Sequence, residues 1–159
     1  LAAVGQMCTS PGLVFLIDSP EAQTLVDDCV NRYEQAQPGT LLSDQVRQSL
    51  SRGVDTLKNA GATLRTGGQS LQGDRCAYAN TLLQIDGDRF VNDAHLFQTE
   101  AFGNAAMFVL CRDAAQLQAA LESLEGNLTG SIYSDTSGSD DSAYESLSPV
   151  LRSRVGRFL

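Results

Sequence analysis

Cys8 is the residue whose type and setting are best suited to chemistry. It lies in GQMCTSPG (residues 5–12), between small and polar residues, and a Pro-Gly break follows it. A thiol with a pKa of about 8.5 is only a few per cent ionised at pH 7, so a reactive cysteine needs help from its site. A free cysteine is also commonly a small buried hydrophobic residue. The segment therefore leaves two interpretations, a nucleophile held on a loop and a structural thiol that precedes a strand.

The other soft or titratable ligands give no metal site. Cys29, Cys76 and Cys111 are far apart in the sequence and show no CxxC spacing, and His95 is the single histidine. A zinc site or a disulfide scaffold is therefore not expected. We expect Cys29 and Cys111 to be core thiols and Cys76 to lie in a polar loop. A pair of His95 with Cys8 is a weaker alternative.

The length and composition of the chain indicate one folded domain. The chain has 159 residues, of which 42% are hydrophobic and 19% charged, with a net charge of −8. Such an acidic chain should repel phosphate backbones, so no nucleic-acid partner is expected. No apolar run approaches the ~20 residues of a membrane span, and no signal peptide is evident. Free thiols without a disulfide pattern indicate a reduced, cytoplasmic protein. The acidic stretch SDTSGSDDS (134–142) lacks the EF-hand spacing and reads as a solvated loop.

Strands and helices that alternate along the chain must position these residues. Residues 13–17 are continuously apolar, which predicts a strand buried on both faces. Ser19-Pro20-Glu21 then predicts a capped helix start, and 3,4-spaced apolar residues extend that helix to about Gln35. Further helices are expected at residues 43–59, 114–124 and 142–154, and Pro149 should kink or break the last of them. Further strands are expected at residues 62–65, 78–85, 107–111 and 128–133. Residues 86–88 are expected to form a turn.

This alternation predicts an α/β fold, a three-layer, largely parallel open sheet with flanking helices. In sheets of this kind, sites form on loops outside the carboxyl ends of the strands. We therefore expect the functional residues at that edge.

Three stretches together resemble the aldehyde dehydrogenase family. GQMC is similar to the GQxC segment that carries the family's nucleophile, and EAFGN (100–104) is similar to its E-x-F-G-P motif. LLQIDGDRFVNDAHLFQTEAFG (82–103) and the tail SPVLRSRVGRFL (148–159) look like the NADP-dependent branch that includes α-ketoglutarate semialdehyde dehydrogenases. The spacing of the two motifs and the strand FVLC after the second also agree with the family. The resemblance covers essentially the whole chain.

Carried over position by position, the resemblance implies three site residues. Cys8 matches the nucleophile, and its N–H would be one donor to the oxyanion. Glu100 matches the residue that hydrogen-bonds the nicotinamide ribose, and Phe102 matches the aromatic that packs beside the nicotinamide ring. Asn104 stands where the family has proline. No metal is implied.

The implied reaction needs more than this chain carries. A thiolate attacks an aldehyde or semialdehyde, hydride leaves for NADP or NAD, and water hydrolyses the resulting thioester to the acid. No glycine-rich phosphate-binding unit is present, and the family's base and oxyanion asparagine would precede Leu1. We therefore expect residues 1–159 to be the nucleophile-bearing catalytic domain, truncated at both ends, without the cofactor-binding domain, and inactive alone. The parent enzyme would be a homo-oligomer.

Two other functions stay open from the residues alone. One is a non-catalytic α/β interaction or structural domain. The other is an acylating relative that passes the thioester to coenzyme A or phosphate instead of water.

Overall fold

A four-stranded sheet forms the centre of the fold. In the computed structural model, which describes residues 2–73 and 75–159, its strands are β1 (Leu13–Ile17), β2 (Thr63–Thr66), β3 (Thr81–Asp86) and β4 (Ala105–Cys111). Their order is β1-β4-β3-β2. Strands β1, β4 and β3 are parallel, whereas β2 runs antiparallel to β3. Leu1 and Asp74, which fall within the segments discussed above, lie outside the described residues.

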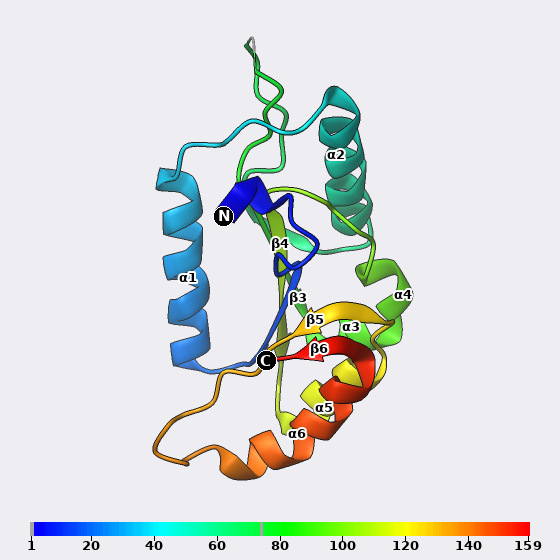
Figure 1. Ribbon diagram of the computed structural model, residues 1–159. Coiled ribbons are helices and arrows are strands. Elements are labelled where there is room, and N and C mark those ends of the chain that lie inside the picture. Colours follow the sequence, from blue (N-terminus) through cyan, green and yellow to red (C-terminus); the bar gives the residue numbers. More distant parts are fainter. Residues whose placement is uncertain (1, 74) are drawn as a thin grey trace.

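Helices cover both faces of this sheet and make the three layers of the fold (Figure 1). Helix α1 (Pro20–Gln35) covers one face alone. The opposite face packs against α3 (Gly87–Asn92), α4 (Ala94–Phe97), α5 (Ala114–Glu122), α6 (Asp141–Arg154) and the end of α2 (Asp44–Asn59). The predicted α/β architecture, with its largely parallel sheet and flanking helices, is confirmed.

Helix α1 begins where the sequence predicts. The Ser19 hydroxyl accepts a hydrogen bond from Ala22 N at 3.1 Å, and Pro20 occupies the first helical position. Both features satisfy the helix terminus, since proline has no N–H to leave unpaired there. Val26 is fully buried against the sheet, but Leu25, expected on the same face, is 47% exposed.

Strand β1 has its predicted bounds and is covered on both faces, although its residues are only partly buried. It pairs only with β4 and is therefore an edge strand. Four of its five residues are half-buried and Ile17 is exposed. The prediction of a strand covered on both faces is confirmed: Leu13 and Phe15 pack against the apolar cluster on one face of the sheet, and Val14 and Leu16 pack against the cluster on the other. Burial is only partial because one edge of β1 has no neighbouring strand among the described residues.

Later segments differ in pairing and in element type. Residues 86–88, expected as a turn, begin α3, because Asp86 Oδ1 caps the helix by accepting a hydrogen bond from Arg89 N at 2.9 Å. β5 (Asn127–Gly130) does not join the main sheet but pairs in parallel with β6 (Val155–Phe158). Helix α6 runs through Pro149 without ending, and the carbonyl that proline leaves unpaired, four residues back, belongs to the exposed Glu145.

Candidate functional site

The Cys8 thiol sits on a tight turn that leads into β1. A short 3₁₀ segment, η1 (Ala2–Gly5), precedes it and has positive φ at Ala3, Val4 and Gly5. Ser10 N then donates to Met7 O at 2.9 Å, which makes Cys8 the second residue of a turn. Cys8 is exposed. Within residues 2–73 and 75–159, the Cys8 N–H has no hydrogen-bond acceptor.

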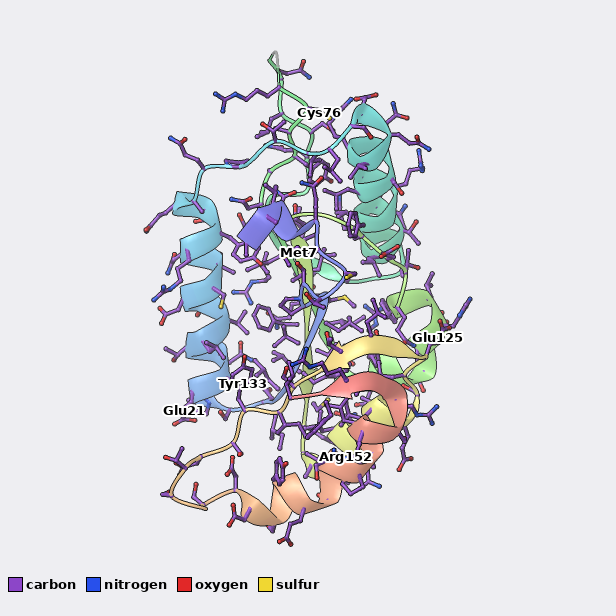
Figure 2. The ribbon with its side chains drawn as sticks, viewed as in Figure 1. Met7, Glu21, Cys76, Glu125, Tyr133 and Arg152 are labelled. Atoms are coloured by element: carbon purple, nitrogen blue, oxygen red, sulfur yellow. The ribbon has the colours of Figure 1, made fainter. Side chains whose placement is uncertain are left out.

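Gln6 fastens this turn to the segment that enters α2. Its Oε1 accepts a hydrogen bond from Leu42 N at 2.7 Å, and its Nε2 donates to Thr40 O at 3.4 Å. Val4 packs against the buried cluster that contains Leu41. In Figure 2, Met7 of this turn lies between α1 and α2, in the same half of the molecule as Cys76.

Gly5 brings the GQMC segment into contact with the EAFGN segment. A Cβ built on Gly5 would lie 2.6 Å from the Gly103 carbonyl carbon, closer still to its oxygen, and 3.2 Å from Asn104 N. Real Cβ atoms do not approach carbonyl groups this closely, so only glycine fits between the two backbones. A hydrogen bond of 2.9 Å from Met107 N to Gly12 O continues the contact toward β1 and β4. The two segments singled out in the sequence therefore lie side by side.

Glu100 and Phe102 lie on the loop between α4 and β4. Glu100 is exposed and Phe102 is half-buried. The backbone of this loop packs closely against helix α2, since a Cβ on Gly53 of α2 would lie 2.8 Å from the Glu100 carbonyl oxygen. Gly103, with a φ of 144°, packs on Leu50 of the same helix. Helix α2 thus fixes the position of the loop that carries Glu100 and Phe102.

This arrangement lies at the amino ends of the parallel strands. The Cys8 turn precedes β1, and the loop with Glu100 and Phe102 precedes β4. The expectation of a site at the carboxyl ends does not hold for these residues, because both motifs lead into their strands rather than out of them. At the carboxyl edge, the structure has a shallow hollow of about 190 Å³ between α3 and α5. Its polar groups are bonded to one another, since Asp88 accepts hydrogen bonds from Arg112 and Gln116 at 2.6 Å each.

Comparison with known proteins finds aldehyde dehydrogenases among the relatives of this chain. The chain is 31% identical over 157 residues to α-ketoglutaric semialdehyde dehydrogenase 2 of Azospirillum brasilense, and 31% identical over 156 residues to α-ketoglutaric semialdehyde dehydrogenase of Acinetobacter baylyi. Each match covers 98% of this chain and 29% of the relative. This chain resembles the aldehyde dehydrogenases. The predicted family resemblance is thereby confirmed, and the chain spans about three-tenths of the length of these curated aldehyde dehydrogenases.

Solved aldehyde dehydrogenases share the fold. A mutant of the aldehyde dehydrogenase from Bacillus cereus superposes with a TM-score of 0.75 at 19% identity, over 98% of this chain and 32% of the other. Betaine aldehyde dehydrogenase from Staphylococcus aureus, solved with NAD+ and with a BME-modified cysteine, gives a TM-score of 0.74 at 19% identity, over 98% of this chain and 32% of the other. No protein-family model matches the chain.

The remaining thiols of this aldehyde dehydrogenase-like chain lie in different settings. Cys111 is fully buried in β4, and burial raises the pKa of its thiol to about 11. Cys29 is half-buried against the sheet from α1. The core placement predicted for both is confirmed. Cys76 is half-buried and lies in the segment between β2 and β3.

His95 does not pair with Cys8. Its side chain is 92% exposed, and its Nδ1 lies 2.7 Å from Glu125 Oε1. Glu125 lies beside α4, away from the Met7 turn (Figure 2). The Glu125 carboxylate raises the pKa of His95, first through the hydrogen bond and then through its charge. A Cys–His pair, the weaker alternative, is therefore absent from the described structure.

The acidic loop is solvated, as predicted. Asp135 accepts hydrogen bonds from the hydroxyls of Ser137 and Ser139, and these bonds lower its pKa to about 2. Among the described residues, no group of three or more potential ligands is arranged to hold a metal ion. No helix in the described part of the chain is long and apolar enough to cross a membrane.

Sequence reasoning missed the residues that hold the Cys8 turn and the loop beside it in place. The sequence indicated Gly5 and Gln6 only as part of the GQMC motif and gave them no structural role. A glycine before a turn can nevertheless signal a close approach of two backbones. Asn104 and Asn80, both buried, gave no signal, because asparagine in a loop is ordinarily exposed.

Proposed function

We propose that residues 1–159 form the nucleophile-bearing domain of an NAD(P)-dependent aldehyde dehydrogenase, which oxidises an aldehyde or semialdehyde to the carboxylic acid. The close contact of Gly5 with Gly103 carries the proposal, because it joins the thiol turn to the loop of Glu100 and Phe102. The relatives named as α-ketoglutaric semialdehyde dehydrogenases support a semialdehyde as the substrate class. In this proposal, the cofactor-binding domain and the general base lie outside these residues.

Cys8 has the exposure and backbone setting that a nucleophile needs. Its thiolate attacks the aldehyde carbon, a C–S bond forms, and the carbonyl oxygen takes the negative charge. The uncommitted Cys8 N–H is available to donate to that oxyanion. After oxidation, the acyl group is a thioester on Cys8. Water then attacks the thioester carbon, the C–S bond breaks, and the acid leaves with the thiol restored.

Glu100 and Phe102 fit one end of a nicotinamide nucleotide. The exposed carboxylate of Glu100 can accept hydrogen bonds from ribose hydroxyls, and the part-exposed ring of Phe102 offers an apolar face to a flat heterocycle. When bound, the nucleotide supplies the hydride acceptor. The sequence has no glycine-rich phosphate-binding unit, so in this proposal these two residues would orient the reacting ring and leave most of the binding to the other domain.

Substitution of Cys8 tests the proposal in the full-length protein that carries this chain. We expect Cys8→Ser to abolish aldehyde-dependent formation of NADH or NADPH. Cys76→Ser, the control at a half-buried thiol outside the two motifs, should retain it. Full activity of Cys8→Ser would overturn the proposal and leave the non-catalytic domain as the better interpretation. Product analysis with and without coenzyme A or phosphate separates hydrolysis from acyl transfer. The 159-residue chain alone should show no oxidation.

A further inference from the structure

Asn104 lies fully buried directly beneath the contact between the two motifs. Its side chain is 1% exposed. Its Nδ2 donates two hydrogen bonds of 2.8 Å, one to Tyr78 O and one to Asn80 Oδ1. Its Oδ1 is buried and has no partner in the described part of the chain. The carboxamide is therefore held through its two donors alone.

Asn80 continues this chain of amides to helix α1. Its Nδ2 donates to Ala36 O at 2.8 Å and to Tyr33 O at 3.2 Å, which satisfies carbonyls at the carboxyl end of the helix. Asn80 is itself 5% exposed. The two buried asparagines thus link the end of α1 to the loop that carries Glu100.

The backbone of Asn104 ties the same point to the sheet and to the thiol turn. Its carbonyl accepts a hydrogen bond from Thr81 N at 2.9 Å, at the start of β3. Its N–H and the preceding Gly103 carbonyl form the surface on which Gly5 rests. A shift of the Asn104 backbone would therefore move the support of the turn that holds Cys8, three residues after Gly5.

We propose that Asn104 is a positioning residue: its carboxamide, held by Asn80 and Tyr78 O, sets the place of the Gly103 carbonyl and so the placement of the Cys8 thiol against the Glu100 loop. The inference rests on the proposed function, in which Cys8 is the nucleophile. Asn104 touches no reacting atom. It acts by keeping two backbones in contact, and a misplacement of about 1 Å can reduce a rate about 100-fold.

Gln116 provides a matched control for the loss of a buried amide. It is 5% exposed, accepts a hydrogen bond from Arg112 N at 2.8 Å and donates to Asp88 at 2.6 Å. It lies at the carboxyl edge of the sheet, away from the thiol turn. A variant at Gln116 therefore removes a comparable buried hydrogen-bonding group without touching the Asn104 link.

Steady-state kinetics of the full-length protein separate position from stability. We expect Asn104→Ala to lower kcat at saturating aldehyde about 10-fold or more with little change in KM. Gln116→Ala should keep kcat within about twofold at a similar loss of Tm. An equal fall of kcat in both variants, or an unchanged kcat in Asn104→Ala, would overturn the inference. An active Cys8→Ser would instead refute the proposed function on which it rests.

Hydrogen–deuterium exchange on the 159-residue chain gives a readout independent of activity. In Asn104→Ala, the amides of Gln6 and Ser10, both hydrogen-bonded in the native turn, should exchange faster. In Gln116→Ala they should exchange as in the unsubstituted chain. If Asn104→Ala does not fold, Asn80→Ala tests the same link one step away and should accelerate the same amides. Unchanged exchange at Gln6 and Ser10 in the folded variant would overturn the inference.

Discussion

Replacement of Gly5 by alanine should release the thiol turn from the loop it rests on. The new Cβ would lie 2.6 Å from the Gly103 carbonyl carbon, and Gly5 has a φ of 67°. A non-glycine residue in a left-handed conformation costs about 1–2 kcal/mol, and overpacking costs about 1–3 kcal/mol. Together they amount to about 2–5 kcal/mol, a large share of the roughly 5–15 kcal/mol that stabilises a domain.

The stability lost in Gly5→Ala can appear in two ways, and thermal unfolding together with NMR exchange detects both. If the turn stays docked, the full penalty lowers Tm by roughly 4–20 °C. If the turn undocks, the global loss is limited to the docking free energy, and the NMR cross-peaks of the Gln6 and Ser10 amides lose their protection from exchange. Thermal unfolding and NMR exchange of the same sample distinguish the two.

Gly12→Ala is the matched control. Gly12 lies in the same segment, its φ is not positive, and a Cβ there would meet no atom within 4 Å. We expect its Tm and its amide exchange to match the unsubstituted chain within about 0.5 kcal/mol of stability. If Gly5→Ala behaves like Gly12→Ala in both measurements, the contact between the two motifs does not exist as described.

Three further predictions follow from single interactions. Ser19→Ala should destabilise the chain by about 1 kcal/mol in urea titration because it removes the cap of α1, whereas Ser142→Ala, in α6, should have no effect. Glu125→Gln should lower the pKa of His95, which NMR of the single imidazole measures. Because Glu125 raises this pKa in the folded chain, the pair stabilises the fold fully below about pH 6.5, and this contribution is lost as pH rises through the raised pKa. Iodoacetamide at pH 8 should leave Cys111 unmodified in the native chain and modify it in urea, since burial raises the pKa of that thiol to about 11; native-state modification would contradict the burial of β4.

Local signals predicted the elements that depend on nearby residues. The Ser19-Pro20 start of α1 and its end at Gln35 appear where expected, since capping and periodicity act within a few residues. The turn expected at residues 86–88 is instead the start of a helix, because Asp-Gly-Asp suits a turn and a helix cap alike, and here Asp86 caps the helix by accepting from Arg89 N. The β5–β6 pair was missed because strand pairing depends on partners far along the chain.

The candidate site was predicted as residue types but not as an arrangement. The motif around Cys8 and the motif from Glu100 could be recognised in the sequence, and the structure brings the two segments together. Why they fit was hidden, because the contact of Gly5 with Gly103 involves backbone atoms that no composition reveals. The burial of Asn104 was hidden for a related reason, since its partners are Tyr78 O and the side chain of Asn80, which precede it by more than 20 residues.

The distance along the chain between the thiol turn and its support has a consequence for synthesis. Gly5 rests on Gly103, and β1 pairs with β4, so the segment around Cys8 emerges from the ribosome before the residues that receive it. At about 5–20 residues per second, roughly 100 further residues take about 5–20 s. The turn can dock only after this interval. A nascent chain therefore carries Cys8 on an undocked turn for seconds, before the backbone that supports the turn has been made.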